Sequence, residues 1–369
     1  MIDKLKLTNF KCFKEETIHF KPMTILTGAN AAGKSSVIQA FLLMQHSNEW
    51  MKNKGEKWQE ESIDINQVFG FPVGAPNALV SQNPTEARHF DFAFEMWEAG
   101  EGYRFQYIID KTSPLDLKIN KGMTFSDRSF QYLNAERVGP RMVNQAGQKN
   151  GIVYNGENAT YLMDMADKTN RGIADVMAGE AMDNQKFSFH VERWMSAILG
   201  EMQLDFHTDY NKAITELWIK NSLVDIGVVP TLTGFGISYV LPIVVAGLWA
   251  SGETQSLLMV ENPEAHLHPY AQSNMGKFLA LLAYCGVQVV VETHSEHIID
   301  GARCQMTKLG SSSQMLVDFM QQSESGIKTY AISVSSGGEL DKWPKGFFDQ
   351  KQQDLREIMM LRRKNAHDR

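Results

Sequence analysis

The sequence predicts an α/β fold whose main sheet is largely parallel, and two observations support this prediction. A short apolar run, Met23–Thr27, leads into a glycine-containing loop and then into residues with the apolar spacing of a helix. From residue 237 onward, segments with helical spacing alternate with short apolar runs typical of buried strands. Alternation of this kind implies a parallel sheet whose faces are covered by helices.

The composition is that of an ordinary folded protein. Of the 369 residues, 43% are hydrophobic and 21% are charged, which allows a sizeable core in one to three domains. The net charge of −7 argues against a general binder of polyanions. Three isolated cysteines, Cys12, Cys285 and Cys304, predict neither a disulfide framework nor a cysteine metal site and favour a reducing cytoplasm.

Neither the N-terminus nor the longest apolar run suggests a membrane protein. The N-terminus alternates charged and apolar residues, unlike a secretory segment. The longest apolar run, Ile237–Ala250, is shorter than the ~20 residues that span a bilayer. We therefore expect a cytoplasmic protein with no membrane partner.

The N-terminal third is predicted to be rich in antiparallel strands. Ile2–Leu7 and Glu16–Phe20 alternate apolar and polar residues, and the helix after the glycine loop is expected to reach about Lys52. Residues 66–84 contain several glycines and prolines and predict loops. Strict alternation from residue 88 to 110 predicts a β-hairpin.

The middle of the chain gives weaker patterns. Residues 131–141 predict a strand that runs into a polar loop, and residues 142–160 predict a mobile segment rich in Gly, Asn and Gln. Residues 171–200 predict helix, and residues 202–208 and 214–220 predict strands. The core positions expected in the helical stretch are Val176, Met177, Met182, Phe187, Trp194, Met195, Ile198 and Leu199.

The last third gives the clearest alternation. A final helix is expected from Lys351, and it ends in the basic cluster Arg362-Arg363-Lys364. The other predicted elements are helices at 237–250, 270–284 and 296–303, and strands at 256–261, 287–292, 314–320 and 327–334.

The loop after the first predicted parallel strand carries a complete phosphate-binding pattern. Residues Gly28–Ser35 match G-x-x-x-x-G-K-[ST] without a mismatch. The glycines let backbone N–H groups turn toward one point, where the helix N-terminus adds positive potential. Lys34 is expected to reach the β- and γ-phosphates of a nucleotide, and Ser35 to ligate Mg²⁺. The predicted contact residues are Gly28, Ala29, Asn30, Ala31, Ala32, Gly33, Lys34, Ser35 and Ser36.

Later segments are expected to bring polar side chains to this loop. The apolar run Leu257–Val260 ends in Glu261, and a carboxylate at the end of a buried strand suits a Mg²⁺ site there. The run Val289–Val291 ends in a polar cluster with His294, which either approaches the γ-phosphate and its attacking water or is structural. Two glycines and Ser238 precede an apolar helix, which offers an anion seat or only a capped helix.

Together these motifs resemble the ABC class of ATPases, in the branch that contains the SMC, RecF and OLD proteins. Leu7–Phe13 resembles the start of those proteins, and Glu261–Pro269 resembles their Walker B motif and D-loop. Thr293–Ser295 resembles the switch-histidine loop, and Gly234–Ser238 occupies the place of the ABC signature. Compact bacterial OLD-like ATPases also share the W-P-x-G-F-F segment, here Trp343–Phe348.

The resemblance implies an ABC-type P-loop ATPase head with a parallel core sheet, an antiparallel β subdomain and a helical signature subdomain. Within a single head, residues 1–135 would form an N-terminal lobe with Walker A, and residues 136–255 the helical signature lobe. Residues 256–335 would form a lobe with Walker B and the switch histidine, and residues 336–369 a tail.

The resemblance also implies ATP and Mg²⁺ as cofactors and a head-to-tail homodimer or higher oligomer. Gly236 and Ser238 would contact ATP bound to a second copy, while Glu261 and His294 would act in hydrolysis. Such compact relatives often accompany an effector in anti-phage defence. Little room follows His294 for the Toprim nuclease of full-length OLD proteins, so we expect any nuclease to be a partner.

Two departures from the family pattern bear on hydrolysis. Glu261 stands where the usual Walker B residue is aspartate, and Asn262 stands where the general-base glutamate is usual. Asparagine cannot accept a proton in that role, so either Glu264 substitutes or hydrolysis is slow and ATP acts mainly as a clamp. The Q-loop glutamine is not identified, with Gln67 and Gln131 as candidates.

Two alternatives concern the ligand. The pairs His266/His268 and His294/His297 could form the metal site of a hydrolase, although the glycine loop would then have no purpose. DNA or RNA is a further candidate partner, because basic residues could meet backbone phosphates. The candidate residues are Arg128, Arg137, Arg141 and the 362–364 tail.

Overall fold

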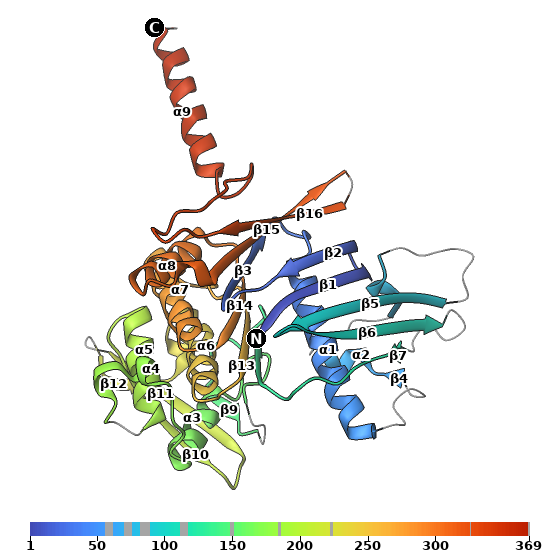
Figure 1. Ribbon diagram of the computed structural model, residues 1–369. Helices are drawn as coiled ribbons and strands as arrows, with labels where there is room; N and C mark the ends of the chain where they lie inside the picture. Colours follow the sequence, from blue (N-terminus) through green and yellow to red (C-terminus); the bar gives the residue numbers. More distant parts are fainter. Residues whose placement is uncertain are drawn as a thin grey trace.

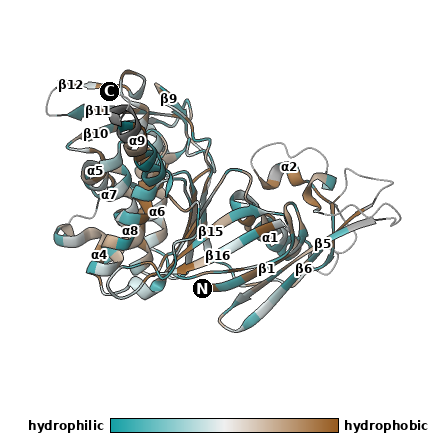
Figure 2. Ribbon diagram, turned by 90° about the horizontal axis from the view of Figure 1, so that it is seen from above, coloured by the Kyte–Doolittle hydropathy of each residue, from teal (hydrophilic) through white to brown (hydrophobic). Residues whose placement is uncertain are grey.

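The computed structural model describes a head built on a central sheet (Figure 1). It describes residues 1–55, 62–69, 76–81, 89–110, 117–147, 151–183, 186–221, 224–324 and 326–367. In these residues the strands form three sheets. Seen from above, the helical lobe and the antiparallel sheet lie on opposite sides of the central sheet (Figure 2). The predicted α/β fold with an antiparallel β subdomain is therefore confirmed.

The central sheet has the strand order β16-β15-β3-β14-β13-β8. Every neighbouring pair is parallel except the hairpin of β15 and β16. The chain segments 1–135 and 256–335 share this sheet, because β3 and β8 pair with later strands. The strands are β3 (Met23–Gly28), β8 (Ser129–Leu133), β13 (Ser256–Glu261), β14 (Gln288–Glu292), β15 (Met315–Ser323) and β16 (Gly326–Ser333).

Continuous apolar runs form these strands because both faces of the sheet are covered. Ile25 and Val291 pack into the core with α6 (Phe235–Ser251), α7 (Pro269–Tyr284) and α8 (Glu296–Lys308). Their neighbours Leu26 and Val290 face the opposite core, with α1 (Lys34–Lys54) and the antiparallel sheet. The period of two along each strand thus divides the side chains between two cores.

The antiparallel sheet has the order β2-β1-β5-β6-β7-β4 and covers α1. The hairpin of β5 and β6 turns at Ala99 and Gly100, whose φ angles of 50° and 86° are positive, as a tight hairpin turn requires. The strands are β1 (Ile2–Phe10), β2 (Phe13–His19), β4 (Ser62–Ile63), β5 (His89–Glu98), β6 (Glu101–Asp110) and β7 (Leu117–Lys121). Between them lie α2 (Ile65–Val68) and the short helix Pro76–Leu79.

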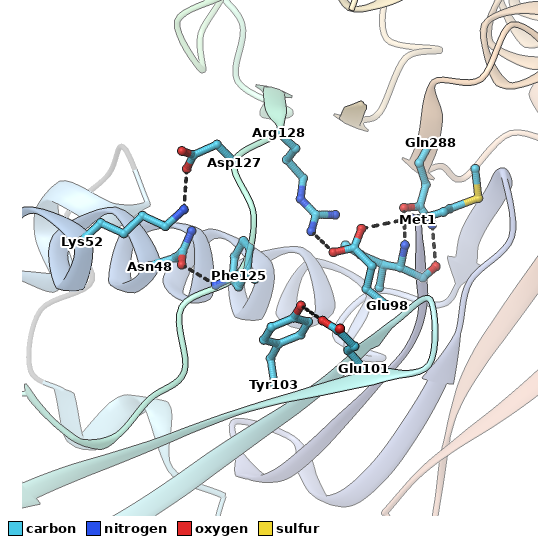
Figure 3. Close-up of polar contacts among 11 residues, drawn as sticks. Met1, Asn48, Lys52, Glu98, Glu101, Tyr103, Phe125, Asp127, Arg128 and Gln288 are labelled. Carbon is cyan, nitrogen blue, oxygen red and sulfur yellow. Dashed lines mark hydrogen bonds and ion pairs between the residues drawn. The ribbon is translucent and has the colours of Figure 1, made fainter. Parts of the chain in front are cut away.

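The N-terminus joins the antiparallel sheet to the central sheet (Figure 3). Ile2 N donates to Gln288 Oε1 at 2.9 Å, and Gln288 Nε2 donates to Ile2 O at 2.7 Å. The amino group of Met1 lies 3.0 Å from Glu98 Oε1. Because Gln288 begins β14, these contacts fix that strand against the antiparallel sheet.

The helical lobe differs most from the sequence prediction. Residues 171–200 are not one helical stretch: they contain the separate helices α4 (Asp175–Ala178) and α5 (Phe187–Leu199), and α3 (Ala159–Lys168) precedes them. Val176 is 44% exposed because it lies on the outer side of the short helix α4, and Met182 is 61% exposed in the turn before α5. The segment expected to be mobile contains β9 (Val143–Gln145), which pairs with β11 (Ile214–Asn221) beside β10 (Gln203–Asp209) and β12 (Val224–Val228).

The C-terminal segment packs on the edge of the central sheet before it leaves the body. Phe347 is buried against Phe319 of β15, with 5.4 Å between ring centroids, and against Trp343 at 4.9 Å. The helix α9 (Gln350–His367) then extends away from the rest of the chain (Figure 1). None of the helices described is long and apolar enough to cross a membrane.

Candidate functional site

The loop between β3 and α1 has the close packing that its glycines predict. Gly28 has φ 137°, and a Cβ there would lie 2.0 Å from the carbonyl oxygen of Met320. Gly33 has φ 97°, and its Cβ would lie 2.6 Å from the ring of Phe13. A larger residue at Gly28 would clash with the backbone of Met320, and one at Gly33 would have to displace the side chains of Phe13 and Cys12 while adopting a positive φ. The loop is therefore held between β15 and the first hairpin.

Lys34 lies inside this loop. Its side chain is 3% exposed, and Nζ donates to Gly28 O at 3.1 Å and Ala29 O at 2.8 Å. Burial lowers the pKa of this ammonium, while the charges of Glu292 and Glu264 act to raise it. The ammonium points back at the carbonyls of the loop, where phosphate oxygens could take their place.

The remaining loop residues form the rim. Ala29, Asn30 and Ala31 are exposed, and Ala32 is buried. Ser36 lies in the first turn of α1, with Oγ 3.9 Å from Cys12 Sγ. The 21-residue helix α1 begins at Lys34, so its N-terminal N–H groups face the loop.

Two carboxylates lie beside Ser35 at the ends of neighbouring strands. Glu261 and Glu292 are direct partners in the register of β13 and β14, and Glu292 is in turn the partner of Leu26 on β3. Ser35 Oγ donates to Glu292 Oε1 at 3.0 Å. The hydroxyl of Tyr132 donates to Glu261 Oε1 at 2.8 Å. Burial is the main cause that raises the pKa of both carboxyls, and the Glu261 charge helps raise that of Glu292 to about 7.

Ser35, Glu261 and Glu292 supply hard oxygen atoms, which are the ligands that Mg²⁺ prefers. Oε2 of Glu292 is buried and has no hydrogen-bond partner among the described residues. This unpaired oxygen next to a serine hydroxyl is an observation that fits a cation here. The metal that the fold family implies is therefore compatible with the residues present.

Glu292 was missed by the sequence reasoning. The apolar run Val289–Val291 drew attention to His294, whereas the carboxylate that ends the strand is the group that contacts the loop. A signal was present: Glu292 ends an apolar strand in the same way as Glu261. What the sequence lacked was the strand order, which puts β14 directly beside β3.

The turn after Glu261 is held by Arg137. The guanidinium is 3% exposed and donates through Nη1 to Glu261 O and through Nη2 to Asn262 O, both at 2.7 Å. Burial lowers the pKa of Arg137 to about 10. Asn262 has φ 44°, and its Oδ1 is buried without a hydrogen-bond partner in the described part of the chain.

Glu264 contacts the switch loop. Its Oε2 accepts from Thr293 Oγ1, and its Oε1 accepts from His294 N, each at 2.7 Å. His294 itself is exposed, and both partial burial and the Lys34 charge lower its pKa. The carboxylate of Glu264 thus holds the backbone that carries His294 toward Lys34.

The signature segment lies beside the turn that follows β13. A Cβ on Gly236 would lie 3.2 Å from His266 O, so the start of α6 packs tightly on the turn after β13. Gly236 lines a cavity of about 500 Å³ together with His266 and Leu267. Ser238 is half-buried one turn into α6. Gly236 therefore opens onto a different cavity from the one that borders the phosphate-binding loop.

The C-terminal segment borders the loop. A cavity of about 440 Å³ is lined by Gly28, Ala29 and His294. The C-terminal residues that also line it are Lys345, Gly346, Phe348, Asp349, Gln350 and Gln353. Part of the W-P-x-G-F-F segment therefore borders the cavity at the phosphate-binding loop, a position that the sequence did not predict.

Of the two Q-loop candidates, the structure describes the side chain of Gln131. Gln131 is buried in β8, where Nε2 donates to Ser129 Oγ and Oε1 accepts from Ile152 N. Gln131 thus supports the chain around Ile152. The side chain of Gln67 lies outside the described part of the structure.

The alternative metal site has no support in the residues that the structure describes. They contain no group of three or more His, Cys, Asp or Glu side chains able to hold a metal ion. His266 packs between Phe235 and Tyr239, at ring distances of 5.1 and 4.6 Å. His268 Nδ1 accepts from Tyr270 N and caps α7. These two histidines have structural roles.

Two of the arginines expected to meet nucleic acid are engaged inside the protein. Arg137 is buried at the site, and Arg128 Nη2 pairs with Glu98 Oε2 at 2.5 Å (Figure 3). The prediction for Arg128 and Arg137 was wrong, because each pairs with neighbouring acceptors rather than solvent. Arg141 and Arg362 are exposed. The side chains of Arg363 and Lys364 lie outside the described part of the chain.

Comparisons with known proteins identify the family of the chain. The family model described as an AAA ATPase domain matches residues 1–137 and 183–299. A second family model, a protein of unknown function (DUF3696), matches residues 311–358. The second match covers β15, β16 and the segment that lines the cavity at the loop.

Individual relatives are distant but cover most of the chain. An OLD nuclease from Thermus scotoductus is 20% identical over 370 residues, which cover 92% of this chain and 68% of that protein. An Smc head bound to the C-terminal winged-helix domain of ScpA has a TM-score of 0.55 and 12% identity, covering 90% of this chain and 98% of the other.

A second solved structure gives the same result. An Smc head from Pyrococcus furiosus, with an extended coiled coil and bound to the C-terminal domain of ScpA, has a TM-score of 0.55 and 11% identity and covers 97% and 99% of the two chains. At these identities the solved structures show the fold, which is that of an ABC-type head. The chain therefore belongs to the AAA ATPase domain family, has the fold of an ABC-type head and is similar to an OLD nuclease and to Smc heads.

Proposed function

We propose that this protein binds ATP with Mg²⁺ at the loop Gly28–Ser36 and hydrolyses it. The observation that carries the proposal is the contact of Ser35 with Glu292, in register with Glu261, at the edge where β3 ends in that loop. Lys34 would exchange its two carbonyl partners for the β- and γ-phosphates. Bound Mg²⁺ would neutralise phosphate charge, and Ser35 and Glu261 would hold it.

Hydrolysis would depend on positioning more than on strong acid–base chemistry. His294 would face the γ-phosphate side of the cavity, on a backbone that Glu264 fixes through two hydrogen bonds. Preorganised donors of this kind stabilise the charge that develops in the transition state. ATP turnover by the full chain, with Lys34→Ala as the inactive comparison, tests the proposal.

A slower, nucleotide-switched scaffold is the second candidate, and Asn262 favours it. An asparagine cannot take the proton of an attacking water, and both oxygens of Glu264 already accept hydrogen bonds. Glu264→Gln and Asn262→Ala turnover measurements distinguish the candidates. Unchanged turnover in Glu264→Gln would remove this residue as the base.

We further propose that two copies meet head to tail around ATP. The described residues that line the cavity at Gly236 include none of the residues Gly28–Ser36, which supports a second copy that supplies Gly236 and Ser238 to the nucleotide. Mass measurement of Glu264→Gln with and without ATP tests this. A measured mass equal to that of a single chain both with and without ATP would contradict the dimer.

The biological output proposed is control of a partner, such as a nuclease effector in anti-phage defence. Two Smc heads of the same fold are bound to ScpA, and the curated relative is a nuclease. Co-purification with proteins encoded beside it tests the partner. A salt-dependent shift assay with duplex DNA and RNA tests nucleic acid, for which Arg141 and Arg362 are the exposed candidates.

A further inference from the structure

The two oxygens of Glu292 have unequal surroundings. The side chain is 5% exposed at the end of β14. Oε1 accepts the hydroxyl hydrogen of Ser35 at 3.0 Å. Oε2 is buried and has no hydrogen-bond partner among the described residues. A buried carboxylate oxygen without a partner is costly unless another group binds it.

The neighbouring cations do not balance this carboxylate. Lys34 Nζ donates to two loop carbonyls, and the Arg137 guanidinium donates to backbone carbonyls of the turn after β13. Glu261 adds a second carboxylate on the adjacent strand, at the position in register with Glu292. The ends of β13 and β14 therefore hold two buried carboxylates, and the nearby cationic side chains donate to backbone oxygens instead of to these carboxylates.

The other polar groups nearby are less suited to a cation. Both oxygens of Glu264 accept hydrogen bonds from the switch loop. Asn262 contributes a neutral amide, and its backbone N donates to Glu292 O at 2.8 Å. Glu292 is thus the acidic group that combines contact with Ser35 and a free oxygen.

We propose that Glu292 is a second carboxylate of the divalent-metal site, with Ser35 and Glu261. The proposal rests on the function proposed above. Because Glu292 Oε1 accepts the Ser35 hydrogen, the lone pairs of Ser35 Oγ are left for the metal. Oε2 binds the ion directly or accepts a hydrogen bond from one of its waters. The site then carries two protein charges instead of the one that the motif at Glu261 supplies.

Binding of Mn²⁺ to the full chain tests this without any need for turnover. Free Mn²⁺ is measured by electron paramagnetic resonance in the wild type and Glu292→Gln, with and without a non-hydrolysable ATP analogue. The amide of glutamine still accepts from Ser35 but carries no charge. We expect at least about 10-fold weaker Mn²⁺ binding in Glu292→Gln under both conditions.

The matched control is Glu339→Gln. Glu339 is exposed in the turn after β16, and we expect its variant to bind Mn²⁺ as the wild type does. Equal Mn²⁺ affinity in Glu292→Gln and the wild type would overturn the inference. Binding of a fluorescent ATP analogue in EDTA is measured on the same samples, and we expect the variant to lie within about twofold of the wild type, because Lys34 is unchanged.

The two proposals fail in different ways. If the wild type bound no nucleotide in EDTA or in Mn²⁺, the proposed function would be contradicted. Weaker Mn²⁺ binding by nucleotide-free Glu292→Gln would still support Glu292 as the second carboxylate of the metal site. Conversely, nucleotide binding with unaltered Mn²⁺ affinity in the variant would leave the function standing and overturn the carboxylate.

A second measurement uses the wild type alone and covers the case in which Glu292→Gln does not fold. Fe²⁺ replaces Mn²⁺, and ascorbate with peroxide generates hydroxyl radicals at the ion that cut the nearby backbone. Cuts are expected around residues 34–36, 260–262 and 291–293. Cuts at the first two segments with none at 291–293 would overturn the inference.

Discussion

Glu261 and Glu292 end neighbouring strands in register, yet their surroundings differ. Glu261 Oε1 accepts from Tyr132, a partner inside the central sheet, whereas Glu292 Oε1 accepts from Ser35, a partner in the phosphate-binding loop. The difference follows from strand order, because β14 separates β13 from β3. A motif identifies the first carboxylate, and only the packing of the strands identifies the second. Motif spacing along the chain therefore identifies Glu261 but not Glu292.

The largest effect is expected from removing the ammonium of Lys34, which lies inside the phosphate-binding loop. Lys34→Ala should lower ATP turnover at least ~100-fold, equivalent to about 2.7 kcal/mol of transition-state stabilisation, because the phosphates lose their buried ammonium. Steady-state turnover measures it. Lys118→Ala, an exposed residue of β7, is the matched control and should retain wild-type turnover. A fully active Lys34→Ala protein would remove the loop from the mechanism.

The carboxylates themselves are compared by double-mutant cycles. Glu261→Gln and Glu292→Gln should each lower turnover by about 10- to 100-fold. Combined with Ser35→Ala, Glu292→Gln should show the larger coupling, on the order of 1–2 kcal/mol, because these two side chains are in direct contact. Equal coupling of Ser35 to both glutamates would contradict the difference in their surroundings.

A third buried carboxylate, Asp318, lies on β15 next to Leu26 of β3 and sharpens the comparison. It is 1% exposed, its Oδ2 has no hydrogen-bond partner in the described residues, and burial, with a smaller effect of Glu16, raises its pKa to about 8 from 3.8. A raised carboxyl pKa means that the folded state holds the proton more tightly. The stability that this gives is fully present below pH ~4 and is lost as the pH rises to ~8.

Asp318→Asn should therefore stabilise the protein at pH 8, on the order of 2–4 kcal/mol, and change little at pH 4. Denaturant unfolding at several pH values measures this difference. Identical pH dependence in the variant and the wild type would show that Asp318 does not titrate in this window.

The smallest expected effect concerns the partner of Glu261. Tyr132→Phe leaves Glu261 Oε1 without the hydroxyl that donates to it, which should cost about 1–2 kcal/mol of the free energy of unfolding. Turnover should fall by no more than about fivefold, because the carboxylate remains in place. Thermal unfolding and steady-state turnover measure the two quantities. A fall in turnover well beyond about fivefold, with the free energy of unfolding changed only as expected, would mean that Tyr132 acts in the chemistry.

The predictability of the fold follows the strength of the local pattern. The runs Leu257–Val260 and Val289–Val291 are buried on both faces, so their apolar character alone predicted the strands. The helical lobe lacks such runs: the short helix α4 lies between α3 and α5, and its residue Val176 has an exposed side chain. Tertiary packing decided those boundaries.

The site was predictable in the same uneven way. The conformation of the loop follows from Gly28 and Gly33, where any side chain would clash. The internal roles of Arg128 and Arg137 could not be read from the sequence, because their partners are 30 and 124 residues away along the chain. The position of Lys345, Gly346 and Phe348 at the cavity depends on β15, which lies beside β3 in the central sheet.

The central claim is that nucleotide and metal meet where Ser35 lies beside the two carboxylates. Anomalous diffraction from crystals grown with Mn²⁺ and a non-hydrolysable ATP analogue tests it most directly. We expect phosphates between Gly28 and Lys34, and one manganese peak about 2.1 Å from Ser35 Oγ, with Glu261 and Glu292 bound to the ion or to its waters. Phosphates outside this loop, or a metal peak away from Ser35, would contradict the account.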